Sequence, residues 1–219
     1  MTTEHESREL TQVGPGTIMG DLMRRYWLPA AKSSELEPDG APMRLMLMGE
    51  KLIAFRDSAG RVGVMDHRCP HRCASLFLGR NEEGGIRCIY HGWKYDVEGN
   101  CLDMPSVTPQ QDFKHKVKAK AYRVVERVGL VWVYMGAERT APPLPGFEIL
   151  DVPESEIGIN LVQNALPPWS LLFGAGKNLP IESEIFVHKW LAQIRCSGVN
   201  KMPTQVGFPP IKGNLLRQF

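Results

Sequence analysis

The chain has 219 residues, and its 26 Lys and Arg against 24 Asp and Glu give a formal net charge of +2. Such a balanced charge gives no reason to expect nucleic acid or a membrane surface as a partner. The polar N-terminus is no secretory signal, and no apolar stretch reaches the roughly 18 residues of a membrane span. We therefore expect a cytoplasmic protein of one or two domains, whose five cysteines are metal ligands and free thiols.

The first part of the chain is expected to be loose and then helical. Residues 1–13 are polar, and Gly14-Pro15-Gly16 is a turn. Thr17 can cap a short helix, because apolar residues follow at helical spacing: Ile18, Leu22 and Tyr26. We expect this helix to anchor the N-terminus without taking part in chemistry, and to end at Trp27-Leu28-Pro29.

From Met43 onward the apolar pattern becomes that of short strands. Two strands, 44–48 and 52–56, flank Gly49-Glu50-Lys51 as in a hairpin, and a third strand covers 62–66. Segments 118–128 and 130–134 are predicted to close the sheet, and 102–105 to form a flap. Short strands separated by turns at this spacing predict a mainly β fold, an antiparallel sandwich or small barrel.

Two short motifs follow the third strand, and each holds one thiol and one imidazole. The first is Cys-x-His, with Cys69 and His71, and the second is Cys-x-x-His, with Cys88 and His91. A Cys2His2 zinc finger pairs Cys with Cys and His with His, whereas here each motif is mixed. A [2Fe–2S] centre with two Cys on one iron and two His on the other needs this layout, because each loop must span both irons. A zinc site and ordinary core residues are the alternatives.

The segments Cys69-Pro70-His71-Arg72 and Cys88-Ile89-Tyr90-His91-Gly92-Trp93 resemble the Rieske signature. The resemblance is to α subunits of Rieske non-haem iron oxygenases, in the phthalate or phenoxybenzoate dioxygenase and vanillate demethylase group, and it covers about residues 14–163. It implies a Rieske-type antiparallel β-sandwich with cluster-binding loops at one end. It also implies a [2Fe–2S] cluster whose ligands are Cys69 and Cys88 on one iron and His71 and His91 on the other.

The cysteines outside the four proposed ligand positions narrow the resemblance to one branch of the Rieske family. Respiratory and photosynthetic members carry an additional Cys in each motif, joined as a disulfide. Cys73 offers a first partner here, but Ile89 and Tyr90 leave the second motif without one. The resemblance therefore points to the oxygenase or soluble ferredoxin branch, and we interpret Cys73 and Cys101 as small buried thiols.

The resemblance also implies partners. An electron donor is expected, either a ferredoxin or a flavin/NAD(P)H reductase, and a homo-oligomer is compatible with the family. Neither nucleic acid nor a membrane is expected. Five basic residues surround the motifs and are either a docking face for an acidic donor or a solvated rim: Arg68, Arg72, Arg80, Arg87 and Lys94.

The resemblance further implies a second metal in full-length relatives, a mononuclear Fe(II) held by two His and one carboxylate in a second domain. Beyond Gln163 no family pattern is visible, and the segment offers only His188, with Glu184 four residues before it. One His and one Glu are not a triad, so we interpret them as a solvated pair on a helix spanning 183–196.

The chain is therefore expected to have four parts. They are an N-terminal segment and helix at 1–26, a Rieske domain at 27–137, a linker with the start of a catalytic domain at 138–163, and an unassigned tail at 164–219, in which that domain is truncated or replaced. The predicted function is one-electron transfer through the cluster, within an oxygenase system that hydroxylates or demethylates aromatic compounds. A free-standing Rieske ferredoxin and a zinc-stabilised binding module are the alternatives.

Overall fold

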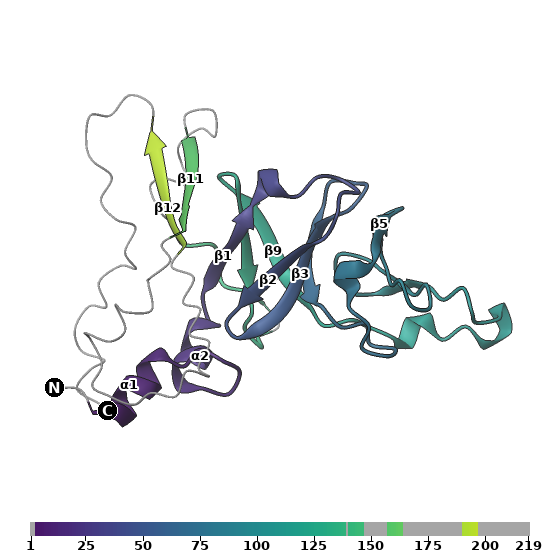
Figure 1. The fold of residues 1–219 in the computed structure, drawn as a ribbon, viewed down its shortest axis with the longest axis horizontal. Helices are drawn as coiled ribbons and strands as arrows, with labels where there is room; N and C mark the ends of the chain where they lie inside the picture. Colours follow the sequence, from purple (N-terminus) through teal and green to yellow (C-terminus); the bar gives the residue numbers. More distant parts are fainter. Residues whose placement is uncertain (1–2, 139, 147–156, 164–189, 197–219) are drawn as a thin grey trace. The chain divides into compact units, whose positions relative to one another are not determined.

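The computed structural model describes residues 3–138, 140–146, 157–163 and 190–196. The chain divides into two compact units, Met1–Phe147 and Glu148–Phe219. The first unit contains two antiparallel sheets and two short helices, and these elements position the site (Figure 1).

The larger sheet has six strands in the order β1-β10-β9-β4-β3-β2. In chain order they are β1 (Trp27–Lys32), β2 (Met43–Leu47), β3 (Glu50–Arg56), β4 (Val62–Asp66), β9 (Ala121–Arg127) and β10 (Leu130–Tyr134). The predicted hairpin, third strand and closing strands are all confirmed. Strand β1 was not predicted from the sequence, because Pro29 argues against a strand. In the structure β1 lies at the edge of the sheet, where a proline is tolerated, and its register is irregular between Pro29 and Ala31.

The smaller sheet has four strands in the order β5-β6-β7-β8. They are β5 (Arg80–Glu82), β6 (Gly85–Arg87), β7 (Lys94–Tyr95) and β8 (Cys101–Asp103). Four 3-10 turns complete the unit: Ser33–Glu35, Leu76–Leu78, Pro109–Gln111 and Lys114–Lys116. The segment predicted as a flap begins within β8. The two sheets confirm the mainly β fold expected from the sequence.

The N-terminal segment is more ordered than the sequence suggested. The prediction of loose residues at 1–13 was wrong, since α1 spans Glu4–Thr11. Thr3 and Glu6 form a capping box that satisfies the first N–H groups of this helix. The predicted second helix is confirmed as α2 (Ile18–Met23), capped by Thr17, although it ends before Tyr26. Within the described residues, no helix has the length and apolar character needed to cross a membrane.

The second unit contributes one antiparallel strand pair, β11 (Ile157–Gln163) with β12 (Trp190–Cys196). The helix predicted over 183–196 is therefore wrong for its last seven residues, while 183–189 lie outside the described residues. The physical reason is that apolar and polar residues alternate from position 192 to position 196, a period of two that suits a strand. In addition, β11 supplies the backbone hydrogen-bond partners.

The first unit has two hydrophobic cores, and β3 contributes to both. Leu52 and Ala54 pack in one core with β1 and β10, whereas Ile53 and Phe55 pack in the other. This division follows from the strand's period of two, which sends successive side chains to opposite faces of the sheet. The second core includes residues of the smaller sheet together with Cys69 and Cys88. Both predicted thiol ligands therefore pack against the face of the larger sheet that presents Ile53 and Phe55.

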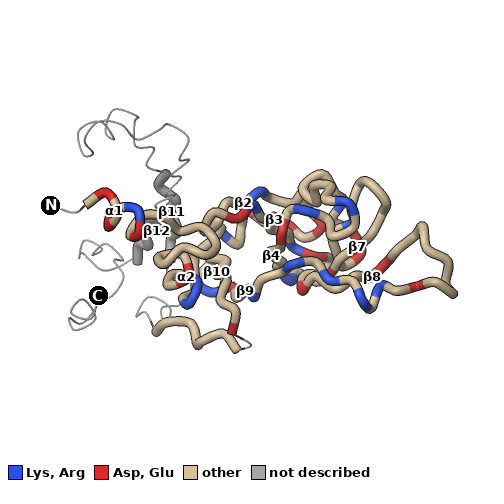
Figure 2. The backbone as a smooth tube through the Cα atoms, turned by 90° about the horizontal axis from the view of Figure 1, so that it is seen from below, with Lys and Arg blue, Asp and Glu red and all other residues tan. Residues whose placement is uncertain are grey.

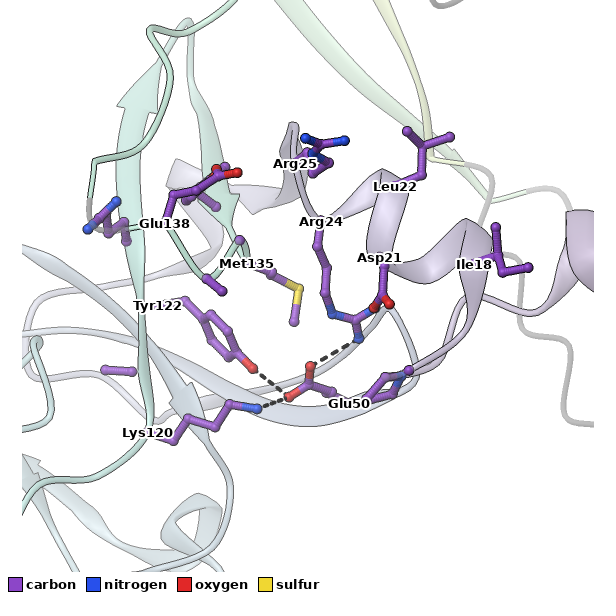
Figure 3. A pocket seen from close by; sticks show the side chains of 17 residues that line it. Ile18, Asp21, Leu22, Arg24, Arg25, Glu50, Lys120, Tyr122, Met135 and Glu138 are labelled. Atoms are coloured by element: carbon purple, nitrogen blue, oxygen red, sulfur yellow. Dashed lines mark hydrogen bonds and ion pairs between the residues drawn. The ribbon is translucent and has the colours of Figure 1, made fainter. Parts of the chain in front are cut away.

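A polar junction joins the N-terminal segment to this sheet (Figure 3). The Glu50 carboxylate accepts hydrogen bonds from Lys120 and Tyr122 and forms an ion pair with Arg24 at 3.1 Å. Arg24 also donates to the carbonyls of Val13 and Met48. Burial alone would raise the pKa of Glu50, but the donors from Lys120, Tyr122 and Arg24 outweigh it and hold the pKa below its ordinary value of 4.5.

We expect Glu50→Gln to lower the free energy of unfolding by about 2 kcal/mol at neutral pH, because three donors lose a charged acceptor. The folded-state pKa of Glu50 lies below its unfolded value, so this contribution is complete above 4.5 and disappears as pH falls through the folded-state pKa. Urea unfolding at pH 7 and at a series of pH values below 4.5 measures both effects. The control is Glu37→Gln, since Glu37 is exposed; equal losses in the two variants would contradict the junction.

Candidate iron–sulfur centre

The two motifs form loops with the same backbone closure. The Cys69 N–H donates to the Ala74 carbonyl at 2.8 Å, and the Cys88 N–H donates to the Trp93 carbonyl at 2.8 Å. In each loop the Cys carbonyl accepts from the residue four positions later, Cys73 in the first and Gly92 in the second. The loops are therefore structural equivalents, although their His residues occupy different positions.

The residue four positions after the motif's first Cys has a left-handed backbone in both loops, with φ of 56° at Cys73 and 73° at Gly92. At Gly92 the absence of a side chain is also a packing requirement, because a Cβ there would lie 2.7 Å from Pro105 Cγ. Arg87 braces the second loop: its guanidinium donates to the Gly92 carbonyl at 2.7 Å and pairs with Asp103 at 2.8 Å. No local sequence pattern predicts this role of Arg87.

The structure brings the four predicted ligands together at the ends of these loops. Cys69 and Cys88 are only 1% and 3% exposed and belong to one core. The His71 and His91 rings lie beside each other, with centroids 4.5 Å apart. The buried Nδ1 of His71 has no hydrogen-bond partner among the described residues. A buried imidazole nitrogen without a partner is costly in a folded protein, and metal ligation would satisfy it.

The electrostatics of the site follow from burial. Burial raises the pKa of the Cys88 thiol, and the neighbouring Cys69 adds to this effect, while backbone N–H groups of Tyr90 and His91 oppose it. Burial also lowers the pKa of His71, with contributions from His91 and Arg72, and so favours the neutral imidazole that ligates metals. The protein thus places backbone donors near the Cys88 sulfur and favours the uncharged form of the His71 ring.

The Tyr95 hydroxyl lies 3.4 Å from Cys69 Sγ in a buried contact. Burial, followed by this contact with Cys69, raises the pKa of Tyr95 far above its ordinary value, so the hydroxyl keeps its proton. A protonated phenol beside a thiolate donates a hydrogen bond to the sulfur. Tyr95 was not singled out from the sequence, because it follows the second motif without a distinctive pattern.

The arrangement offers two pairs of side chains, as a binuclear cluster requires. Among the described residues, no three His, Cys, Asp or Glu side chains converge on one point that would hold a metal ion. A structural zinc ion needs four ligands around one centre. A [2Fe–2S] centre needs only two protein ligands on each iron, one pair of thiolates and one pair of imidazoles. The buried thiols and the adjacent imidazoles are two such pairs.

The structure bears on two expectations about the surroundings of the motifs. The interpretation of Cys73 as buried was wrong, since Cys73 is exposed, whereas Cys101 is buried and burial raises its pKa to about 11. Three of the five basic residues form ion pairs, and Figure 2 shows acidic and basic residues interleaved along the backbone. Arg87 pairs with Glu82 and Asp103, Arg80 with Glu82, and Lys94 with Glu83.

Two further places could be considered for a metal. The hollow of Figure 3, between α2 and the ends of β9 and β10, is lined by no His or Cys and contains the Glu50 junction. His188 and Glu184, the residues considered for a second metal, lie outside the described residues.

Comparison with known proteins agrees with this geometry. Residues 26–122 match the model of the Rieske [2Fe-2S] domain. The chain is 55% identical over 163 residues to the 3-chlorobenzoate-3,4-dioxygenase oxygenase subunit of Comamonas testosteroni, an alignment that covers 74% of this chain and 38% of that subunit. It is 44% identical to the 5,5'-dehydrodivanillate O-demethylase oxygenase subunit of Sphingobium, over 68% of this chain and 35% of that subunit.

Among solved structures, dicamba monooxygenase bound to dicamba superimposes with a TM-score of 0.56 at 27% identity, over 64% of this chain and 41% of that chain. The Rieske-type fold predicted from the two motifs is thereby confirmed. The chain spans well under half the length of each of these relatives. It contains a Rieske [2Fe–2S] domain at residues 26–122, and through it the chain is homologous to the oxygenase subunits of aromatic-ring dioxygenases and demethylases.

Proposed function

We propose that this chain carries single electrons through a Rieske [2Fe–2S] cluster bound by Cys69, His71, Cys88 and His91. The observation that carries the proposal is the pair of equivalent loops, which place two buried thiols in one core and two imidazoles side by side. When bound, such a cluster accepts and releases one electron at a potential in the range of about −150 to +300 mV, because two neutral imidazoles replace two thiolates.

The surrounding residues would set the properties of the cluster. The Tyr95 hydroxyl would donate to a Cys69 thiolate, and the backbone N–H groups of Tyr90 and His91 donate to the Cys88 sulfur. A donor to a ligand sulfur stabilises the more negative, reduced state more than the oxidised one. Loop packing keeps both thiols from water, while His71 and His91 are only half-buried. The imidazole side is therefore where an electron would enter or leave.

We further propose that the chain serves an oxygenase system that hydroxylates or demethylates an aromatic compound. The names of the relatives support this assignment, since they are oxygenase subunits of a dioxygenase and an O-demethylase. The proposed layout is a Rieske domain at 27–137, a linker at 138–163 and a tail at 164–219. Because that tail contains a single His, we propose that this chain transfers electrons without a mononuclear iron site of its own.

The proposed electron donor is a ferredoxin or a flavin/NAD(P)H reductase, and the proposed compartment is the reducing cytoplasm. The four cysteines whose side chains the structure describes, Cys69, Cys73, Cys88 and Cys101, are all free thiols, which suits that compartment. Homo-oligomeric assembly is part of the same proposal.

Iron and acid-labile sulfide per chain, after anaerobic purification, test the proposal directly. We expect about two of each, since a [2Fe–2S] cluster is the proposed cofactor. One zinc ion without sulfide would establish the zinc-stabilised module instead. A third iron with unchanged sulfide would show a mononuclear site in the tail and contradict the proposed division of labour.

We expect His91→Cys to lower the reduction potential by more than about 100 mV, because it adds an anionic thiolate to the iron that neutral imidazoles hold. Spectroelectrochemical titration of the visible bands measures the shift. His115→Cys is the control, since His115 is exposed and is not a proposed ligand. A colourless, folded His91→Cys variant, from a colourless parent, would rule out the cluster.

We expect Tyr95→Phe to lower the potential by about 40 mV, which corresponds to a hydrogen bond about 1 kcal/mol stronger in the reduced state. Tyr26→Phe is the matched control, because Tyr26 is 53% exposed and lies before β1. Equal potentials for both variants and the parent would show that the Tyr95 hydroxyl does not act on the cluster.

A further inference from the structure

An exposed aromatic residue is connected to one of the proposed imidazole ligands by ring contacts. His71 stacks on Trp93, with ring centroids 4.2 Å apart and planes within 5°. Trp93 in turn meets the edge of Phe113 at 5.9 Å. Trp93 is buried, whereas Phe113 is 39% exposed. Two ring-to-ring contacts therefore lead from the surface to His71.

Phe113 lies on a loop that covers this side of the motifs, residues 105–118, here called the Phe113 loop. Pro105 meets Gly92 at its start, and Val107 and Val117 pack against the core that contains both thiols. The backbone of Lys118 bridges to Asn100 at its end. The loop is thus held against the second motif, and its position relative to His71 is fixed by packing.

The Phe113 loop carries an excess of positive charge. Lys114, Lys116 and Lys118 are exposed, and the single acidic residue of the loop, Asp112, pairs with Lys114 at 3.1 Å. In the described part of the chain no carboxylate forms an ion pair with Lys116, Lys118 or Arg72, and Arg72 is exposed beside His71. By contrast, Arg80, Arg87 and Lys94 are neutralised by Glu82, Glu83 and Asp103.

We propose that the Phe113 loop, together with Arg72 next to His71, is the docking surface for an acidic electron-donor protein, and that the electron enters on the His71 side. This inference rests on the proposed function. An exposed aromatic residue on a loop that also carries unpaired cations has the composition of an interface, and the cations would steer an acidic partner. The side of His91 differs, since its exposed neighbours Ile89 and Tyr90 are uncharged. In the docked complex one electron passes from the reduced donor, which is oxidised, to the cluster, which is reduced, and no bond is made or broken.

The test is stopped-flow reduction of the full chain, loaded with its cluster, by a pre-reduced acidic plant-type [2Fe–2S] ferredoxin. We expect Lys116→Gln/Lys118→Gln to lower the second-order rate constant about tenfold at low ionic strength, and the difference to vanish near 0.5 M salt, roughly where screening becomes strong. Arg25→Gln/Arg123→Gln is the matched control, because it removes the same charge from exposed residues that line the hollow near α2. The control should react like the parent.

Equal rates for the parent and the Lys116→Gln/Lys118→Gln variant, or a parent rate independent of salt, would overturn the docking surface. Reduction by dithionite separates this outcome from a failure of the proposed function. The variant should be reduced by dithionite as fully as the parent, with the same visible spectrum. A parent that dithionite does not reduce would overturn the proposed function and the docking surface together.

Discussion

The arrangement of the site depends on the burial of β3 and β4 on both faces. Ile53, Phe55 and Met65 face the core that holds Cys69 and Cys88, while Leu52, Ala54 and Val64 face the other core. Because successive side chains of a strand point in opposite directions, β3 and β4 pack on both cores at once. They therefore connect the interior of the six-stranded sheet to the core beneath the two cysteine-bearing loops. A shift of one residue in the register of β3 would exchange the two sets and remove the support beneath both thiols.

On that support, two loops with equivalent backbone closure face each other. Each loop closes with the Cys N–H donating to a carbonyl five residues later, and each needs a left-handed residue at the fourth position. The first loop uses Cys73 there and the second uses Gly92. Gly92 adopts this conformation readily, whereas the same conformation at a non-glycine residue such as Cys73 carries a cost that surrounding contacts must offset.

Charge is organised around the site in two ways. Close to the second loop, ion pairs are structural: Arg87 holds the Gly92 carbonyl while two carboxylates neutralise it. A second set of charges, Lys116, Lys118 and Arg72, has no such partners among the described residues. Lys116 and Lys118 share a loop with Phe113, whose ring meets Trp93, and Arg72 follows His71 in the sequence. Charges of the first kind fix a loop, and charges of the second kind remain available to another protein.

The sequence by itself determined the cofactor class and most of the strands, and it predicted the four ligands. Cys and His at the spacing of the two motifs leave few alternatives, and alternation of apolar residues predicted β2, β3, β4, β9 and β10. It did not determine β1, whose Pro29 is tolerated only because the strand lies at a sheet edge, or β12, whose pairing with β11 outweighs any helical tendency. Tyr95, Arg87 and Phe113 are ordinary residues in the sequence. Only the tertiary structure decided that they contact the site, because each reaches it through a packing or hydrogen-bond contact that local sequence patterns do not encode.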